Sequence, residues 1–170
     1  PWDRRLVAFE EAADALAFLR DIYMENRKPA VLVGFTRWKQ KTVAGFLQGA
    51  EPPRFEQKVD AAVRLAAEKK GRLLVWNTRC PPDLRETAAA AGVALTNVED
   101  GFLRSVGLGS ALTPAASLVF DDLGIYYDPR QESRLEMLAE QGSFPPALLE
   151  RARALRETIV QRAVTKYNVG

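Results

Sequence analysis

The sequence has 170 residues, of which 47% are hydrophobic and 27% charged, proportions typical of a globular domain and not of a disordered chain. Its 24 Lys and Arg residues nearly balance its 22 Asp and Glu residues, and a net charge of +2 does not indicate nucleic-acid binding. The absence of histidine and the single cysteine, Cys80, exclude an intrachain disulfide and a zinc cluster, so we expect no metal and no bound cofactor.

The first third of the chain alternates helical and strand patterns. Apolar residues recur at helical spacing over residues 9–23, which predicts an amphipathic helix that packs on the rest of the domain. Residues 30–33 form an apolar run that predicts a strand, followed by a turn at Gly34 and a helix over about 36–47. The Pro-containing stretch 51–54 is typical of a loop.

The middle third continues this alternation. One apolar face over residues 59–66 predicts a helix, and residues 72–76 predict the next strand. Asp83 and Glu86 have capping-box spacing, which predicts a helix to about residue 91. The chain then returns as a strand over residues 93–98.

The last third begins with a predicted hairpin. Residues 117–120 are read as a short buried strand, 121–124 as a tight turn and 125–127 as a returning strand. Ser133 and Glu136 form a second capping-box pair, and a long helix is expected over about 148–163.

Short strands that alternate with helices favour an α/β fold with right-handed crossovers. We expect a Rossmann-like, three-layer domain with a mostly parallel sheet of about four or five strands. No repeat or linker interrupts the sequence, so residues 1–170 are expected to form a single domain. No apolar stretch approaches the roughly 20 residues that span a bilayer, so any membrane contact is expected to be peripheral.

Charged residues gather where the strand over 93–98 ends. Glu99 and Asp100 precede Gly101, and Arg104 and Ser105 follow within a few residues, so two carboxylates and a guanidinium share one corner. Two interpretations are open. The corner either lines a binding cleft, or Arg104 neutralises the carboxylates as a clamp on the loop.

Other polar residues follow predicted strands at the same edge of the sheet, where ligands of open α/β sheets bind. Arg79 and Arg104 suit a sugar carboxylate or a phosphate because a guanidinium forms paired hydrogen bonds, although Arg79 is equally well an exposed loop cation. On a strand, Tyr126 and Tyr127 would point to opposite sides, one into the core and one towards a sugar.

The helix expected after Gly34 is a weaker indication of a binding site. Its N-terminal backbone N–H groups, together with Arg37 and Lys39, suit an anion, but no fuller motif accompanies them. Trp38 is more typical of a core residue than of a ligand platform. The pair Gly107 and Gly109 lacks the third glycine of a dinucleotide-binding motif.

Four motifs taken together are more specific than any one of them: E-D-G-F-L-R-S at 99–105, S-L-V-F-D-D-L-G-I-Y-Y-D at 117–128, S-R-L-E at 133–136 and T-K-Y-N-V-G at 165–170. This combination resembles the bacterial capsule-polysaccharide β-Kdo glycosyltransferase family of the KpsC type. The resemblance runs from about Trp76 to Gly170, and G-F-T-R-W-K at 34–39 is similar to an upstream signature of that family.

The resemblance implies one lobe of a GT-B-like glycosyltransferase. Members of the family transfer Kdo from CMP-Kdo to a lyso-phosphatidylglycerol-linked acceptor, at the cytoplasmic face of the inner membrane, as they build the capsule linker. Their second lobe supplies a catalytic Asp and a His-Pro motif for the donor. Because the sequence stops before that lobe would begin, we expect a retaining β-Kdo transferase lobe that is inactive in isolation and holds no catalytic residue.

The resemblance also implies roles for particular residues. Glu99, Asp100, Arg104, Ser105, Arg79, Tyr126 and Tyr127 become candidates for acceptor binding or for the cleft wall. Lys166, Tyr167 and Asn168 become candidate contacts between lobes, and their terminal position predicts that they fray.

Two other functions stay open in principle. The chain is alternatively a non-catalytic module that binds a capsule glycolipid or another protein of capsule assembly and export. A glycosidase that uses Glu99 and Asp100 is disfavoured because neighbouring residues of an extended segment point to opposite sides. Neither the linkage formed, the acceptor, the module represented nor the oligomeric state follows from the sequence.

Overall fold

The computed structural model of the protein describes residues 6–169, so the last residue of the T-K-Y-N-V-G motif, Gly170, lies outside the described residues. Its centre is a five-stranded sheet with strand order β2-β1-β3-β4-β5. The strands are β1 (Ala30–Val33), β2 (Arg54–Glu56), β3 (Arg72–Trp76), β4 (Ala94–Asp100) and β5 (Leu118–Asp121). All neighbouring strands pair in parallel except β5, which is antiparallel to β4.

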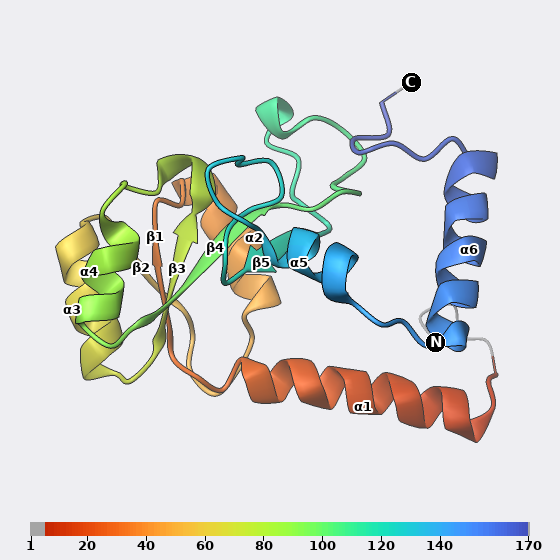
Figure 1. Cartoon of the computed structure of the whole chain (residues 1–170), viewed down its shortest axis with the longest axis horizontal. Helices are drawn as coiled ribbons and strands as arrows, with labels where there is room; N and C mark the ends of the chain where they lie inside the picture. Colours follow the sequence, from red (N-terminus) through yellow and green to blue (C-terminus); the bar gives the residue numbers. More distant parts are fainter. Residues whose placement is uncertain (1–5, 170) are drawn as a thin grey trace.

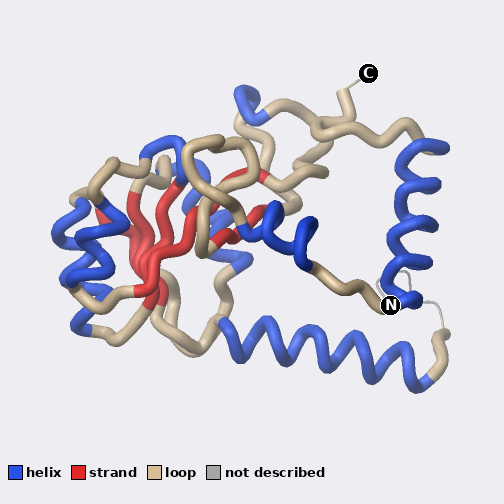
Figure 2. Tube along the Cα trace, viewed as in Figure 1, coloured by secondary structure: helices blue, strands red, loops and turns tan. Residues whose placement is uncertain are grey.

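Helices cover both faces of the sheet (Figures 1 and 2). The helices are α1 (Phe9–Glu25), α2 (Arg37–Phe46), α3 (Val59–Glu68), α4 (Leu84–Ala90), α5 (Arg134–Gln141) and α6 (Pro146–Gln161), with short 3-10 turns η1 (Asn77–Arg79) and η2 (Gly109–Ala111). Buried residues of α3 and α4 pack on one face of the sheet, and Val43 of α2 packs on the other. The predicted three-layer, mostly parallel α/β fold is therefore confirmed.

The two faces of the sheet follow the alternation of side chains along each strand. In β3, Leu73 and Val75 join the cluster beneath α3 and α4, whereas Leu74 and Trp76 join the cluster beneath α2. Leu73, Leu74 and Val75 are fully buried, as is typical of central parallel strands covered on both faces. The continuous apolar run over residues 73–76 thus reflects burial on two sides.

The predicted hairpin is wrong, because residues 125–127 form no strand. The Asp121 carboxylate accepts hydrogen bonds from the backbone N–H groups of Leu123 and Gly124, both at 2.9 Å. From β4, the buried Asn97 amide donates to the carbonyls of Asp121 and Gly124, at 3.3 and 2.9 Å. Asp121 and Asn97 thus supply hydrogen-bond partners for backbone groups of the turn. Strand β5 pairs with β4 and not with a strand that follows the turn.

Strand β2 was not expected: it begins at Arg54, at the end of the stretch 51–54, whereas residues 51–53 form a loop as predicted. Its three residues, R-F-E, pair in parallel with β1 in the register Val31 to Arg54. Phe55 is the only apolar residue among them, and its ring lies 6.0 Å from that of Phe35. A single apolar residue has no periodicity, so only pairing with β1 makes this segment a strand.

The N-terminal helix forms as expected, but its predicted packing is wrong. None of the residues of α1 is buried, and the side chain of Phe9 is 81% exposed. Helix α6 likewise buries no residue, and both helices lie outside the sheet layers in Figure 1. An amphipathic pattern predicts a helix with an apolar face, but it does not specify what covers that face.

The two predicted capping boxes differ in outcome. At α5, the Ser133 hydroxyl accepts from the Glu136 backbone N–H, and the Glu136 carboxylate accepts from the Ser133 N–H at 2.8 Å. At α4, Asp83 makes no side-chain cap and has helical dihedral angles, φ −91° and ψ −3°. A capping side chain needs an extended backbone to reach the first turn, so Asp83 cannot cap.

Replacement of Ser133 by alanine should lower the free energy of unfolding by about 1 kcal/mol, because it leaves backbone donors of α5 without a partner. Urea denaturation measures this change. Asp83→Ala is the matched control and should change stability by less than about 0.5 kcal/mol. Equal losses in the two variants would contradict the structural difference between the two sites.

Candidate functional site

The candidate site lies at the end of β4, which extends to Asp100 and therefore includes both carboxylates. Glu99 pairs with Val119 and Asp100 with Leu118 across the ladder to β5. Successive strand residues point to opposite faces, so Asp100 faces α2 whereas Glu99 faces the side of α4. The corner expected from the sequence is thus divided between the two faces of the sheet.

On the α2 face, Asp100 meets two cations. Its carboxylate lies 3.0 Å from Arg104 Nε and 3.7 Å from Lys39 Nζ. The same Lys39 ammonium lies 3.2 Å from the ring centroid of Trp76, a cation–π arrangement. Burial lowers the pKa of Lys39, although Asp100 and Glu99 oppose that shift by favouring its charged form.

The side chain of Arg104 is only 1% exposed and holds the loop that follows β4. Its Nη1 donates to the Ser105 hydroxyl at 2.8 Å and to the Thr113 carbonyl at 3.0 Å. The Ser105 hydroxyl in turn donates to the Gly107 carbonyl at 2.7 Å. This geometry is that of the loop clamp, the alternative left open by the sequence, and direct contact of Arg104 with a ligand stays a prediction.

On the opposite face, Glu99 is 8% exposed and joins a short hydrogen-bond chain. The Tyr127 hydroxyl donates to Glu99 Oε2 at 2.8 Å and accepts from the Asn77 amide at 3.2 Å. Glu99 Oε1 accepts from the Asp100 backbone N–H at 3.1 Å. The structure therefore links the end of β4 to η1, which follows β3.

The two tyrosines lie in a turn, so the expectation of strand alternation with one ring in the core is wrong. Tyr127 is 45% exposed and Tyr126 is half-buried. The Tyr126 hydroxyl donates to the Asp100 carbonyl at 3.4 Å, and its ring lies 4.7 Å from Phe102 and 5.2 Å from Tyr127. Tyr127 thus contacts the Glu99 carboxylate, whereas Tyr126 contacts the backbone of Asp100.

The pKa of Tyr127 is raised from 10.0 to about 12, first by burial and then by the adjacent Glu99 carboxylate. Because the unfolded state ionises first, stability from this group is complete below pH 10 and is lost as the pH rises towards 12. Tyr127→Phe should therefore weaken the fall of stability between these pH values. Urea denaturation at several pH values tests this, and an unchanged slope would contradict it.

The candidate interlobe residues pack on the loop after β4, so the prediction that they fray is wrong. The Lys166 carbonyl accepts from the backbone N–H groups of Arg104 and Ser105, at 2.8 and 3.2 Å. The Tyr167 carbonyl accepts from the Gly107 N–H at 2.8 Å, and the Asn168 amide donates to the Ser105 carbonyl at 3.1 Å. These bonds join segments about 60 residues apart in sequence, and contact with a second lobe stays a prediction.

Arg79 lies in η1 and is exposed, outside both hydrogen-bond networks. Its Cβ would be 3.2 Å from a Cβ placed on Gly34, which has a φ of +84°. Glycine at this position thus permits both the left-handed backbone and the close approach of η1 to the end of β1.

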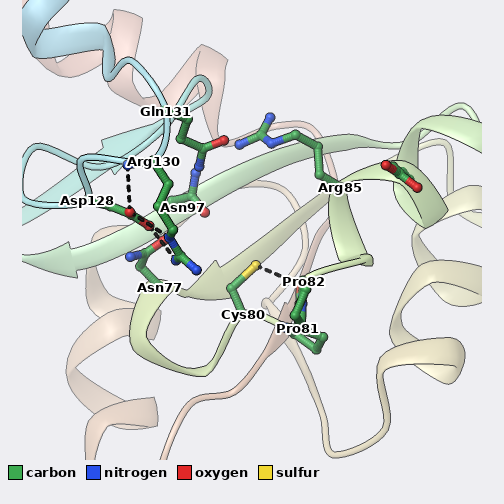
Figure 3. A pocket seen from close by; sticks show the side chains of 10 residues that line it. Asn77, Cys80, Pro81, Pro82, Arg85, Asn97, Asp128, Arg130 and Gln131 are labelled. Atoms are coloured by element: carbon green, nitrogen blue, oxygen red, sulfur yellow. Dashed lines mark hydrogen bonds and ion pairs between the residues drawn. The ribbon is translucent and has the colours of Figure 1, made fainter.

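A cavity of about 290 Å³ opens beside η1 on the Glu99 face of the sheet (Figure 3). Its lining residues come from η1, the start of α4, β4 and the loop after β5: Asn77, Cys80, Pro81, Pro82, Arg85, Glu86, Asn97, Asp128, Arg130 and Gln131. No pattern in the sequence predicted this cavity. Its polar residues come from three separate stretches of the sequence, and only Asp128 belongs to one of the four motifs, so folding is needed to bring them together.

Ion pairing orders part of the cavity wall. Arg130 binds the Asp128 carboxylate through Nε at 2.8 Å and Nη2 at 2.6 Å, which lowers the pKa of Asp128 to about 2. Burial raises the pKa of the Cys80 thiol. Within residues 6–169, no group of three or more metal-ligating side chains is assembled, and no helix is long and apolar enough to cross a membrane.

The family model of the capsule polysaccharide biosynthesis protein family matches residues 71–169 of this chain. The chain belongs to this family. It is 30% identical over 161 residues to the capsule polysaccharide modification protein LipA of Neisseria meningitidis, a match that covers 92% of the chain but 23% of LipA. It is 46% identical over 85 residues to the lipopolysaccharide-processing protein LpsZ of Rhizobium meliloti, over 49% of the chain and 19% of LpsZ. The chain thus spans less than a quarter of these relatives.

The solved structures that share the fold include two Kdo transferases. The β-Kdo 2,4 transferase of Thermosulfurimonas dismutans KpsC superposes with a TM-score of 0.67 and 28% identity, over 85% of this chain and 43% of that one. The β-Kdo 2,7 transferase of the same KpsC gives a TM-score of 0.58 and 28% identity, over 79% of this chain and 43% of that one. The α/β fold is therefore that of GT-B-like Kdo transferases of the KpsC type, in agreement with the motifs at 99–105 and 117–128.

Proposed function

We propose that this chain is the N-terminal lobe of a retaining β-Kdo glycosyltransferase that transfers Kdo from CMP-Kdo to a lipid-linked acceptor during synthesis of the capsule linker. The observation that carries the proposal is the similarity in both sequence and fold to two Kdo transferases, which covers 85% and 79% of the chain. Membership of the capsule biosynthesis family supports the same assignment.

In this proposal, the lobe supplies one wall of the cleft and the contacts with the acceptor. The carboxyl ends of β3 and β4 bring Asn77, Glu99 and Asp100 to one edge of the sheet, where open α/β folds bind ligands. Arg104 and Lys39 hold Asp100 in place, and Tyr127 holds Glu99. These residues organise the site, and the covalent step requires a carboxylate of a second lobe that follows Lys166, Tyr167 and Asn168.

The acceptor and location follow from the same proposal. A phosphoglycolipid acceptor lies in a membrane, so we propose peripheral association with the inner membrane on its cytoplasmic side. Residues 166–168 hydrogen-bond to the loop after β4, which supports a role for them at the junction of two lobes. If a second lobe moved, these bonds would transmit the movement to the candidate site.

Incubation of the complete protein with CMP-Kdo and a lipid-linked acceptor tests the proposal. We expect the complete protein to add Kdo and the 170-residue chain to add none. Mass spectrometry of the acceptor measures the product. Binding of the glycolipid without any transfer by the complete protein would overturn the proposal and favour a non-catalytic binding module of capsule assembly.

A further inference from the structure

The cavity in Figure 3 lies on the opposite face of β4 from Asp100, and of its lining residues only Asp128 belongs to one of the four motifs. Its volume of about 290 Å³ lies just below the roughly 300–1,000 Å³ typical of small-molecule sites. Its size therefore suits a ligand of one small ring and not an extended ligand.

The hydrogen-bonding groups of the cavity are only partly used within the protein. Arg85 donates from Nη1 and Nη2 to the backbone carbonyls of Asp122 and Leu123, at 3.3 and 2.6 Å, which leaves its Nε–H. Arg130 uses Nε and Nη2 on Asp128, which leaves its Nη1 donors. The Asn77 amide nitrogen binds Tyr127, so its carbonyl oxygen is available as an acceptor.

The chemistry of this lining matches hydroxyl groups. Two arginines are balanced by Asp128 and Glu86, so net charge alone does not select the ligand, and hydrogen-bonding groups decide what binds. A hydroxyl group both donates and accepts hydrogen bonds, and the lining offers both functions. Pro81 and Pro82 add a rigid apolar wall for C–H groups, whereas no aromatic ring among the described residues lines the cavity to stack on a nucleobase.

We propose that this cavity binds one sugar residue of the acceptor, a subsite separate from the Asp100 corner. This inference rests on the proposed glycosyltransferase function, because it assigns the acceptor's sugar to a place on the lobe. The Arg130 Nη1 and Gln131 side chain meet the sugar's oxygens, and the Arg85 guanidinium, fixed by two carbonyls, completes the donor set.

The hydrogen-bond chain from Asn77 through Tyr127 to Glu99 connects this subsite to the end of β4. A sugar that hydrogen-bonds to the Asn77 carbonyl oxygen therefore also fixes the rest of that amide group, whose nitrogen donates to the Tyr127 hydroxyl. We therefore expect a ligand in the cavity to affect the position of the Glu99 carboxylate through these hydrogen bonds, without touching it.

NMR titration of the isotope-labelled chain with the methyl β-glycoside of Kdo, and separately with CMP, tests the subsite. We expect the glycoside to shift the backbone amides of Asn77, Arg130 and Gln131, and CMP to leave them unchanged. Arg130→Gln and Gln131→Ala should each weaken glycoside binding at least tenfold. Gln131 is exposed and makes no side-chain hydrogen bond among the described residues, so its replacement preserves the fold.

Arg153→Gln is the matched control, because Arg153 is also an exposed, ion-paired arginine but lies on α6. It should bind the glycoside as the wild type does. Shifts confined to residues 99–105, or unchanged affinity in both cavity variants, would overturn the subsite and leave the proposed function intact. No shift with millimolar glycoside would also overturn the subsite, whereas transfer by the complete protein independently decides the proposed function.

Discussion

Replacement of Arg104 by alanine is expected to lower the free energy of unfolding by about 3–5 kcal/mol, the largest change in stability foreseen at the candidate site. The side chain is 1% exposed, pairs with Asp100 at 3.0 Å and binds Ser105 and the Thr113 carbonyl. Its removal leaves the Asp100 carboxylate with Lys39 alone, at 3.7 Å, and opens a cavity beneath the loop. Urea denaturation, monitored by circular dichroism, measures the loss.

The control for this prediction is Arg153→Ala, which breaks an exposed ion pair with Glu150 on α6. Exposed pairs contribute about 0–1 kcal/mol, so this variant should unfold nearly as the wild type does. A loss below about 1 kcal/mol for Arg104→Ala would show that the buried clamp contributes no more than a surface pair. Arg104 would then be better explained as a ligand contact.

Replacement of Asp100 by asparagine in the complete protein is expected to lower kcat/KM for Kdo transfer at least about 100-fold. Asparagine keeps the size of the side chain but removes the charge that holds Lys39 and Arg104, and a shift of about 1 Å in a positioning residue can cost that much. Comparison of initial transfer rates at several acceptor concentrations measures the effect.

Asp122→Asn is the matched control, because Asp122 is an exposed aspartate whose partner is Arg134 of α5. It should retain wild-type transfer. Circular dichroism establishes that both variants are folded before rates are compared. Wild-type turnover by a folded Asp100→Asn protein would refute the assignment of this corner to the site.

The sequence predicts which residues of the candidate site lie close together, but not which face of the sheet each one occupies. Glu99, Asp100, Arg104 and Ser105 lie within seven residues of one another, so their proximity could be predicted from the E-D-G-F-L-R-S motif. Their division between two faces depends on how far β4 extends, and the pairing of Asp100 with Leu118 sets that length. Strand ends are defined by pairing with a neighbour, so a single sequence does not locate them.

Lys39 and the cavity illustrate contacts between distant segments. Lys39 lies 61 residues before Asp100 in sequence, and only the packing of α2 on the sheet brings its ammonium to that carboxylate. The cavity similarly collects Asn77, Arg85 and Arg130 from three separate segments. No spacing rule relates such residues, because each contact depends on the whole path of the chain.

Local patterns in the sequence were enough to predict the α/β class, four of the five strands, the Ser133 cap and the polar corner after β4. These features arise from periodicity, backbone preference and short-range hydrogen bonds within a few residues. The short β2, the hydrogen bonds from Asn97 to the turn after β5, the buried state of Arg104 and the cavity emerged only with the folded chain. Each of these features depends on which distant segments pack together and on how much water that packing excludes. Local sequence patterns specify neither.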